Sequence, residues 1–145
     1  MDARTPTSAI ENATEKDIAS VLELWKTAGG PTSVSDTPEG LAHLLRTDPQ
    51  ALLLARSDGT PIGSLIAAWD GWRGNFYKLV VHPAHRRQGL ATRLLREGER
   101  RFRSRGAIRL TAIVVENDPI AVSFWNAVGY EQQTQRTRFV RRLED

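Results

Sequence analysis

A basic turn between an expected strand and an expected helix carries the side chains best suited to chemistry. The segment reads LVVHPAHRRQGLATRLL. The first turn of a helix has unpaired N–H groups and a partial positive charge, so it attracts anions. Gly89 and Ala91 leave the backbone uncovered there. Arg86, Arg87 and the Thr92 hydroxyl add side-chain donors. The turn is therefore predicted to bind a pyrophosphate.

Several other kinds of site do not fit the sequence. The turn lacks the Lys-Ser/Thr of a P-loop and the G-x-G-x-x-G spacing of a dinucleotide-binding fold. The chain has no cysteine, which excludes disulfides, thiolate nucleophiles and thiolate metal sites. The histidines, His43, His82 and His85, have no ligand-spaced partners, so no metal is expected. For His82, a structural or surface role is preferred over a proton relay near neutral pH.

The turn has to be positioned by a mixed set of strands and helices. Apolar periodicity and turn residues predict strands at residues 8–12, 51–56, 61–69, 76–82, 109–115 and within 130–142. Capping and stop signals predict helices that start after Thr14, Thr37, Gly89 and Asp118. The Asp58-Gly59 pair predicts a tight hairpin. This order indicates an α+β fold, a mixed sheet with helices on its faces.

Length, composition and charge limit the function classes. A chain of 145 residues fits one domain, residues 1–145, with a sizeable core. No apolar run approaches the roughly 20 residues that cross a bilayer, and the first residues lack the apolar stretch of a secretory signal, so a cytoplasmic location is expected. The net charge of +3 comes nearly all from arginine. Arginine suits phosphate and carboxylate partners, and a basic balance also attracts nucleic acid or membranes without specificity.

Three short motifs follow a pattern shared by a known enzyme family. Residues 86–91 match (Arg/Gln)-x-x-Gly-x-(Gly/Ala), and residues 124–130 match (Phe/Leu)-(Tyr/Trp)-x-x-x-Gly-(Phe/Tyr). On these motifs and on the order of its elements, the chain resembles the GNAT N-acetyltransferase superfamily. Residues 70–74, DGWRG, resemble the corresponding turn of its YpeA-like branch.

The resemblance implies a fold and a cofactor site. It implies a central, mostly antiparallel mixed sheet that splays in a V between strands 76–81 and 109–115, with acetyl-CoA in the splay. Backbone groups of the first strand would hold the pantetheine and the basic turn the pyrophosphate. The residues expected to bind acetyl-CoA are Leu79, Val80, Val81, Arg86, Arg87, Gln88, Gly89, Leu90, Ala91, Thr92, Asn117, Asp118 and Trp125. Asp118 occupies the position of the family's asparagine, and Asn117 serves instead if the loop shifts by one residue.

The catalytic groups are less sharply indicated than the cofactor site. Asp70 is a candidate base for the amine, although capping of its own turn, with Arg73 as a partner, is the preferred interpretation. Glu116 is the second candidate base. Many family members have a tyrosine that acts as general acid where this chain has Trp125. The indole of Trp125 cannot supply a proton near neutral pH. Tyr130, water or another group would then reprotonate the CoA thiolate.

Two tryptophans near the Asp70 turn are candidates for contacts with the acceptor. Trp69 is expected to pack in the core. Trp72 lies in a polar turn and is better placed for substrate or for the partner subunit of a homodimer.

The leading hypothesis is an enzyme that moves acetyl from acetyl-CoA directly to a primary amine of a small molecule or a protein N-terminus. It needs acetyl-CoA as co-substrate, no metal, no membrane and no specific nucleic acid. The alternatives are a non-catalytic acetyl-CoA-binding module and, below it, a basic nucleic-acid-binding domain, for which no recognition motif is found.

Overall fold

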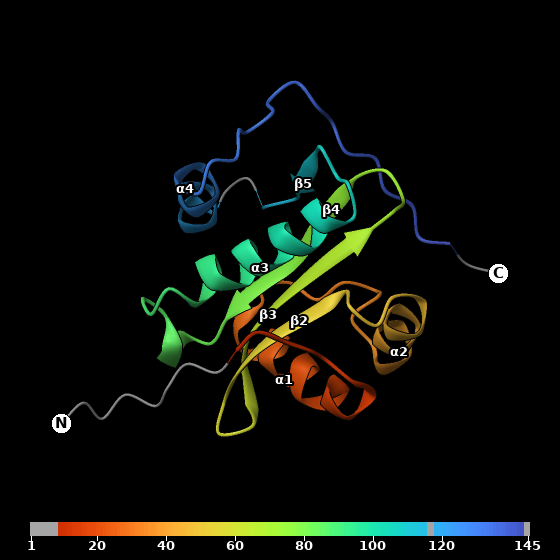
Figure 1. Cartoon of the computed structure of the whole chain (residues 1–145), viewed down its shortest axis with the longest axis vertical. Helices are drawn as coiled ribbons and strands as arrows, with labels where there is room; N and C mark the ends of the chain where they lie inside the picture. The colour runs from red at the N-terminus through yellow and green to blue at the C-terminus, as the bar shows by residue number, and fades with distance from the viewer. Residues whose placement is uncertain (1–8, 116–117, 144–145) are drawn as a thin grey trace. The chain divides into compact units, whose positions relative to one another are not determined.

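The computed structural model describes residues 9–115 and 118–143 (Figure 1). The chain divides into two compact units, Met1–Ala112 and Ile113–Asp145, and each is described by itself. The single domain expected from the sequence stays a prediction. Among the described residues, no helix combines the length and the apolar character needed to cross a membrane.

A five-stranded sheet forms the centre of the first unit. Its strands lie in chain order: β1 (Glu11–Asn12), β2 (Leu52–Ser57), β3 (Thr60–Trp69), β4 (Gly74–Val81) and β5 (Leu110–Ala112). Neighbouring strands are antiparallel, except that β4 and β5 are parallel. The sheet is therefore mixed and mostly antiparallel, as predicted.

Helices cover both faces of this sheet. The helical elements are η1 (Glu15–Asp17), α1 (Ile18–Ala28), α2 (Pro38–Thr47), η2 (Pro83–His85), α3 (Leu90–Ser104) and, in the second unit, α4 (Pro119–Ala127). Leu52 and Leu54 of β2 pack in one buried cluster with residues of α1 and α2. Ala55, the next residue, packs in another cluster with Leu90 of α3. Since successive strand residues point to opposite faces, α1 and α2 cover one face and α3 the other (Figure 1).

The β2–β3 hairpin is closed as its sequence predicts. Asp58 and Gly59 have φ angles of 50° and 80°. Two consecutive left-handed residues make the type of turn whose twist matches that of paired strands.

Three predicted strands are shorter than expected or absent. The strand predicted at 109–115 covers only Leu110–Ala112, which pairs with β4 alone. The strand predicted at 8–12 covers Glu11–Asn12, and Ser8 lies outside the described residues. No strand forms in residues 130–143, so that prediction was wrong. Their sequence is largely polar and lacks the alternation that buries one face of a strand.

An irregularity in β4 decides which way its side chains point. Ser64 pairs with Val80 and Ile66 pairs with Tyr77, so two residues, Lys78 and Leu79, lie opposite one residue of β3. This is a β-bulge, which leaves its extra residue out of the ladder. Lys78 has a left-handed φ of 56°.

The bulge has a visible effect on packing. Phe76 lies beside Phe102 of α3, with ring centroids 5.2 Å apart. Val80 belongs to the cluster with α1 and α2. Residues four apart on a regular strand share a face, so the bulge moves Val80 to the opposite face from Phe76.

Helix α3 packs its predicted apolar stripe against the sheet. Its buried residues are Leu90, Leu94, Leu95, Gly98 and Phe102. A Cβ at Gly98 would lie 2.7 Å from Phe76, so this glycine permits the close approach of helix and strand. Close packing at Gly98 therefore holds the middle of α3 against β4.

Candidate functional site

The segment after β4 is closed by hydrogen bonds of His82. Its backbone N–H donates to the carbonyl of Ile62 at 2.8 Å, which ends the β3–β4 pairing. Its ring Nδ1 accepts from the N–H of Ala84 at 3.1 Å, and its carbonyl accepts from the N–H of His85 at 2.8 Å. His82 is therefore the cap of η2, which supports the structural role preferred from the sequence.

The basic turn reverses the chain with two left-handed residues. Arg87 has a φ of 65° and Gly89 a φ of 76°. A Cβ at Gly89 would meet no atom within 4 Å, so glycine is favoured there by its backbone angle and the space above it is open. Arg86 reaches back, and its Nε donates to the carbonyl of Val81 at 3.3 Å. The turn is thus attached to the end of β4.

The first turn of α3 has no side-chain cap. The first hydrogen bond of the helix runs from the N–H of Arg93 to the Gly89 carbonyl, at 3.0 Å. The preceding N–H groups, from Leu90 to Thr92, belong to the set that an α-helix leaves without an internal acceptor. They open next to an exposed turn, which makes this end of α3 suitable for an anion.

Two other helices of the chain satisfy the same groups with a side chain. At α2, the Thr37 hydroxyl accepts from the N–H of Gly40 at 3.0 Å. At α4, the Asp118 carboxylate accepts from the N–H of Ala121 at 3.1 Å. The start of α3 differs from both, because its capping residue, Gly89, has no side chain.

The charge at the start of α3 is not neutralised by nearby carboxylates. Arg86 and Arg87 are exposed, and within the described part of the chain neither forms an ion pair. Arginines of the later turns are paired: Arg96 with Glu99 at 2.7 Å, Arg100 and Arg101 with Glu97 at 2.7 and 2.9 Å, and Arg105 with Asp48 at 3.1 Å. Arg103, near the far end of the helix, is also exposed and has no ion pair in the described residues. Only the helix start combines unpaired arginines with amides that lack a side-chain cap.

The edge of β4 next to this turn is only partly used by its neighbour. β5 pairs with β4 from Gly74 to Phe76, where Phe76 lies opposite Ala112. β4 continues to Val81. Within the described residues, no strand pairs with this edge at Leu79, Val80 or Val81, so three predicted cofactor residues lie on a stretch of open edge that leads into the basic turn.

Asp70 caps the turn between β3 and β4. Its Oδ1 accepts from the N–H groups of Trp72 and Arg73 at 2.8 and 2.6 Å, and its Oδ2 accepts from the Asn75 amide at 3.5 Å. The Arg73 backbone N–H, followed by that of Trp72, holds the pKa of the Asp70 carboxyl below its usual value. A lowered pKa weakens a carboxylate as a base for an amine.

The two tryptophans near this turn differ in environment. Trp69 lies with its ring centroid 6.1 Å from that of Phe102, in contact with the core, as expected. Trp72 is 69% exposed, and the Arg73 guanidinium stacks 4.0 Å above its ring. Trp72 is therefore accessible to a ligand or a partner.

The second unit holds the aromatic motif. Asp118 is the N-cap of α4, which begins at Pro119. The Trp125 and Tyr130 rings meet edge to face at 4.9 Å, and the N–H of Tyr130 donates to the carbonyl of Trp125 at 2.9 Å. Glu116 and Asn117, predicted as base and cofactor ligand, lie outside the described residues.

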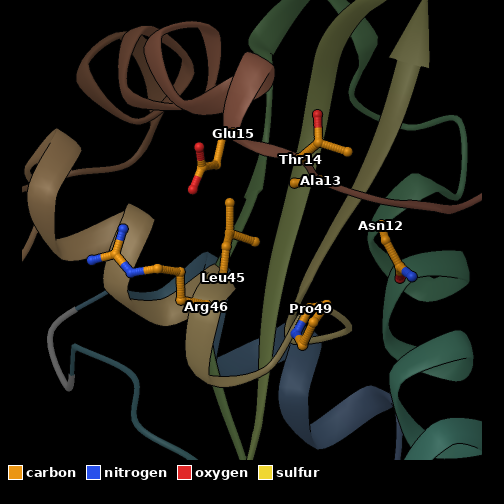
Figure 2. Close-up of a pocket in the computed structure, with 7 residues that line it drawn as sticks. All are labelled: Asn12, Ala13, Thr14, Glu15, Leu45, Arg46 and Pro49. Atoms are coloured by element: carbon orange, nitrogen blue, oxygen red, sulfur yellow. The ribbon is translucent and has the colours of Figure 1, made fainter.

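A cavity in the first unit lies apart from the predicted site residues. It measures about 340 Å³ and is lined by the segment leading into α1 and by the end of α2 (Figure 2). Its lining residues are Asn12, Ala13, Thr14, Glu15, Leu45, Arg46 and Pro49. It includes none of the residues predicted to bind or react. The described residues also contain no group of three metal-ligating side chains.

No role was predicted for Ser64, which the structure buries in the first unit. Its hydroxyl lies between the Trp25 indole and the Lys78 carbonyl. The sequence feature that could have pointed to Ser64 is its position within the otherwise apolar and small residues of β3.

Comparison with known proteins identifies relatives along most of the chain. The model of the Acetyltransferase (GNAT) family matches residues 18–130. An acetyltransferase of Yersinia pestis (strain Pestoides F) is 30% identical over 119 residues, which cover 82% of this chain and 84% of the relative.

Solved structures share the fold at lower identity. An aminoglycoside antibiotic 6'-N-acetyltransferase from Acinetobacter haemolyticus matches with a TM-score of 0.73 and 23% identity, over 94% of this chain and 100% of the other. The PaiA N-acetyltransferase from Thermoplasma acidophilum, solved in complex with coenzyme A, matches with a TM-score of 0.74 and 17% identity, over 89% and 92%.

Proposed function

Because the chain belongs to the GNAT acetyltransferase family, we propose that it moves the acetyl group of acetyl-CoA directly to a primary amine, of a small molecule or of a protein N-terminus. The observation that carries this proposal is the start of α3, an uncapped helix end beside two arginines without ion pairs in the described residues. The coenzyme A complex of one structural neighbour supports it.

Residues of the first unit suit two parts of acetyl-CoA, the pyrophosphate and the pantetheine. The left-handed Arg87 and Gly89 open the amides of the turn and of the first turn of α3, which suit a pyrophosphate. Arg86 and Arg87 add positive charge that attracts a phosphate. The open edge of β4 at residues 79–81 offers peptide groups to the amides of a pantetheine. When bound, acetyl-CoA supplies an activated acyl thioester.

The reaction requires groups of the chain, or water, to transfer two protons. The attacking amine must be neutral, so one group accepts a proton from its nitrogen, and the departing sulfur must receive one. Asp70 and Glu116 are the proposed bases. Asp118, Asn117 and Trp125 are proposed to complete the cofactor site, and Tyr130 is proposed to supply the proton to the sulfur.

Substitution separates the two candidate bases. Asp70→Asn keeps the shape and an acceptor for the turn amides, and Glu116→Gln is equally conservative. If either is the base, turnover falls by about 10²–10⁴-fold, with acetyl-CoA affinity unchanged. Asp58→Asn, in the β2–β3 turn, is the matched control. Normal turnover in both variants would show that neither carboxylate is the base.

The acceptor and the setting of the reaction belong to the same proposal. The relative from Acinetobacter haemolyticus is named for an aminoglycoside, so amino sugars join small amines and peptide N-termini as acceptors to test. The exposed Trp72 with its stacked Arg73 is proposed to contact the acceptor or a second copy of the chain. The cytoplasm is the proposed location, and the YpeA-like branch stays a prediction.

The test is release of the CoA thiol in the presence of acetyl-CoA and a panel of amines. The proposal predicts amine-dependent release with at least one acceptor class. Binding of acetyl-CoA without release for any amine would favour a non-catalytic acetyl-CoA-binding module, an alternative that Trp125 at the usual tyrosine position keeps open. Absence of acetyl-CoA binding would overturn both.

A further inference from the structure

A buried serine hydroxyl connects three elements of the first unit. Among the described residues, Ser64 is the only polar residue that is buried, with 0% exposure. Its hydroxyl accepts from Trp25 Nε1 at 2.8 Å and donates to the backbone carbonyl of Lys78 at 2.8 Å. Both the donor and an acceptor site of the hydroxyl are thus used, and α1, β3 and β4 are joined by one chain of hydrogen bonds.

The carbonyl that Ser64 holds belongs to the strained residue of the β4 bulge. Lys78 adopts a left-handed φ of 56°, which long L side chains rarely do. Its ammonium is also held, 2.6 Å from the Asp36 carboxylate and 5.0 Å from the centre of the Trp25 ring. The backbone and the side chain of Lys78 are therefore fixed by separate partners.

The bulge sets the position of the strand that follows it. With the bulge, Leu79 to Val81 lie on the part of β4 that leads into the basic turn. Without it, the register against β3 would slip by one residue, and every following side chain would change faces. The buried Val80 would then leave the cluster with α1 and α2.

We infer that Ser64 is a positioning residue for acetyl-CoA. It holds the Lys78 carbonyl, which maintains the bulge and with it the open edge from Leu79 to Val81. This inference rests on the proposed function, because the ligand that uses the edge is acetyl-CoA. Ser64 does not contact the ligand itself; it acts through Lys78.

The test uses the backbone preference of residue 78. Ser64→Ala removes the hydroxyl and is expected to weaken acetyl-CoA binding about tenfold, the effect of one lost buried hydrogen bond. Lys78→Gly adopts a positive φ without strain, so in that background Ser64→Ala should weaken binding by less than about threefold. Lys78→Ala is the matched control, because it loses the same side chain and keeps the steric cost, so there the tenfold effect should persist.

A purely structural role gives a different pattern. Ser64→Ala would then lower the unfolding temperature without changing affinity, or it would weaken binding equally in the glycine and alanine backgrounds. Either result overturns the inference. If Ser64→Ala does not fold, Trp25→Phe removes the indole N–H together with part of a buried ring. It should weaken binding about threefold, and unchanged binding would be equally contradictory.

A second readout separates this inference from the proposed function. Amide exchange of Leu79 to Val81 should become faster in Ser64→Ala and return toward the unsubstituted rate in Ser64→Ala with Lys78→Gly. If the unsubstituted protein does not bind acetyl-CoA, the proposed function fails whatever the exchange rates are. If it binds and the exchange rates do not change, the positioning role alone fails.

Discussion

The start of α3 and its later turns differ in whether their arginines form ion pairs with carboxylates. At the start, Gly89 provides no side-chain cap, and Arg86 and Arg87 have no ion pair within the described residues. Toward the other end, most arginines meet carboxylates, as Arg100 meets Glu97 at 2.7 Å. The helix therefore begins with uncapped amides beside unpaired arginines, whereas most of the arginines in its later turns are balanced by carboxylates.

The contrast shows that arginine content alone does not locate a ligand. Glu97 serves two arginines, and the Arg100 and Arg101 guanidinium groups hold the pKa of the Glu97 carboxyl down to about 2. Those arginines contribute to the basic composition, but much of their charge is balanced locally. This weakens the alternative of a nucleic-acid-binding domain, which needs a continuous basic face.

The largest expected effect comes from closing the start of α3. Gly89→Val puts a β-branched side chain at a φ of 76° and above the open amides. Loss of about two hydrogen bonds to a charged group, each worth about 1.5–3 kcal/mol, predicts at least a roughly hundredfold weaker acetyl-CoA binding by calorimetry.

The chain offers a matched control for that substitution. Gly59 in the β2–β3 turn has a φ of 80° and equally open space around a Cβ. Both valine variants should lose about 1–2 kcal/mol of stability, but Gly59→Val should bind acetyl-CoA normally. Equal affinity in the two variants would remove the start of α3 from the site.

A smaller effect is expected from the arginines of the turn. Replacing Arg86 and Arg87 together by glutamine should weaken acetyl-CoA binding about tenfold, since exposed charges contribute modestly. The dependence of the affinity on salt should fall as well. The control replaces Arg100 and Arg103 by glutamine, and affinity and salt dependence should stay unchanged. If the control weakened binding as much, the difference between the two ends would not govern binding.

The smallest effect concerns Glu97, which pairs with two arginines, and it appears only in acid. The folded pKa of Glu97, about 2, lies below its usual 4.5. Its contribution to stability is therefore complete above about pH 4.5 and is lost as the pH falls toward 2. Glu97→Gln should lose less on acidification, by about 2–4 °C in the unfolding temperature between pH 5 and pH 2.5. An identical loss in both proteins would show that Glu97 is not held by its arginines.

The sequence predicted the parts of the fold that local residue types determine. The Asp58-Gly59 turn, the Thr37-Pro38 start of α2 and the stripe of α3 all follow from short-range preferences, and the structure confirms them. The basic turn belongs to the same class, because glycine at position 89 signals its left-handed backbone.

Features that depend on distant partners were not predicted. A lysine such as Lys78 gives no indication in the sequence of a positive φ. Its conformation is held by Ser64 and Asp36, which are distant in the chain. The length of β5 depends on pairing with β4, and an apolar run alone overestimated it. The sequence left two roles open for Asp70, a catalytic base and a cap of its own turn. Its hydrogen bonds in the structure are those of the turn cap.

The most direct test of the account is a calorimetric titration with acetyl-CoA and with S-acetyl-pantetheine, which lacks the pyrophosphate and the nucleotide. If the start of α3 binds the pyrophosphate, acetyl-CoA should bind one to one with micromolar affinity, about −8 kcal/mol. S-acetyl-pantetheine should then bind at least about a hundredfold more weakly. Equal affinity for the two ligands, or no binding of acetyl-CoA, would contradict the account.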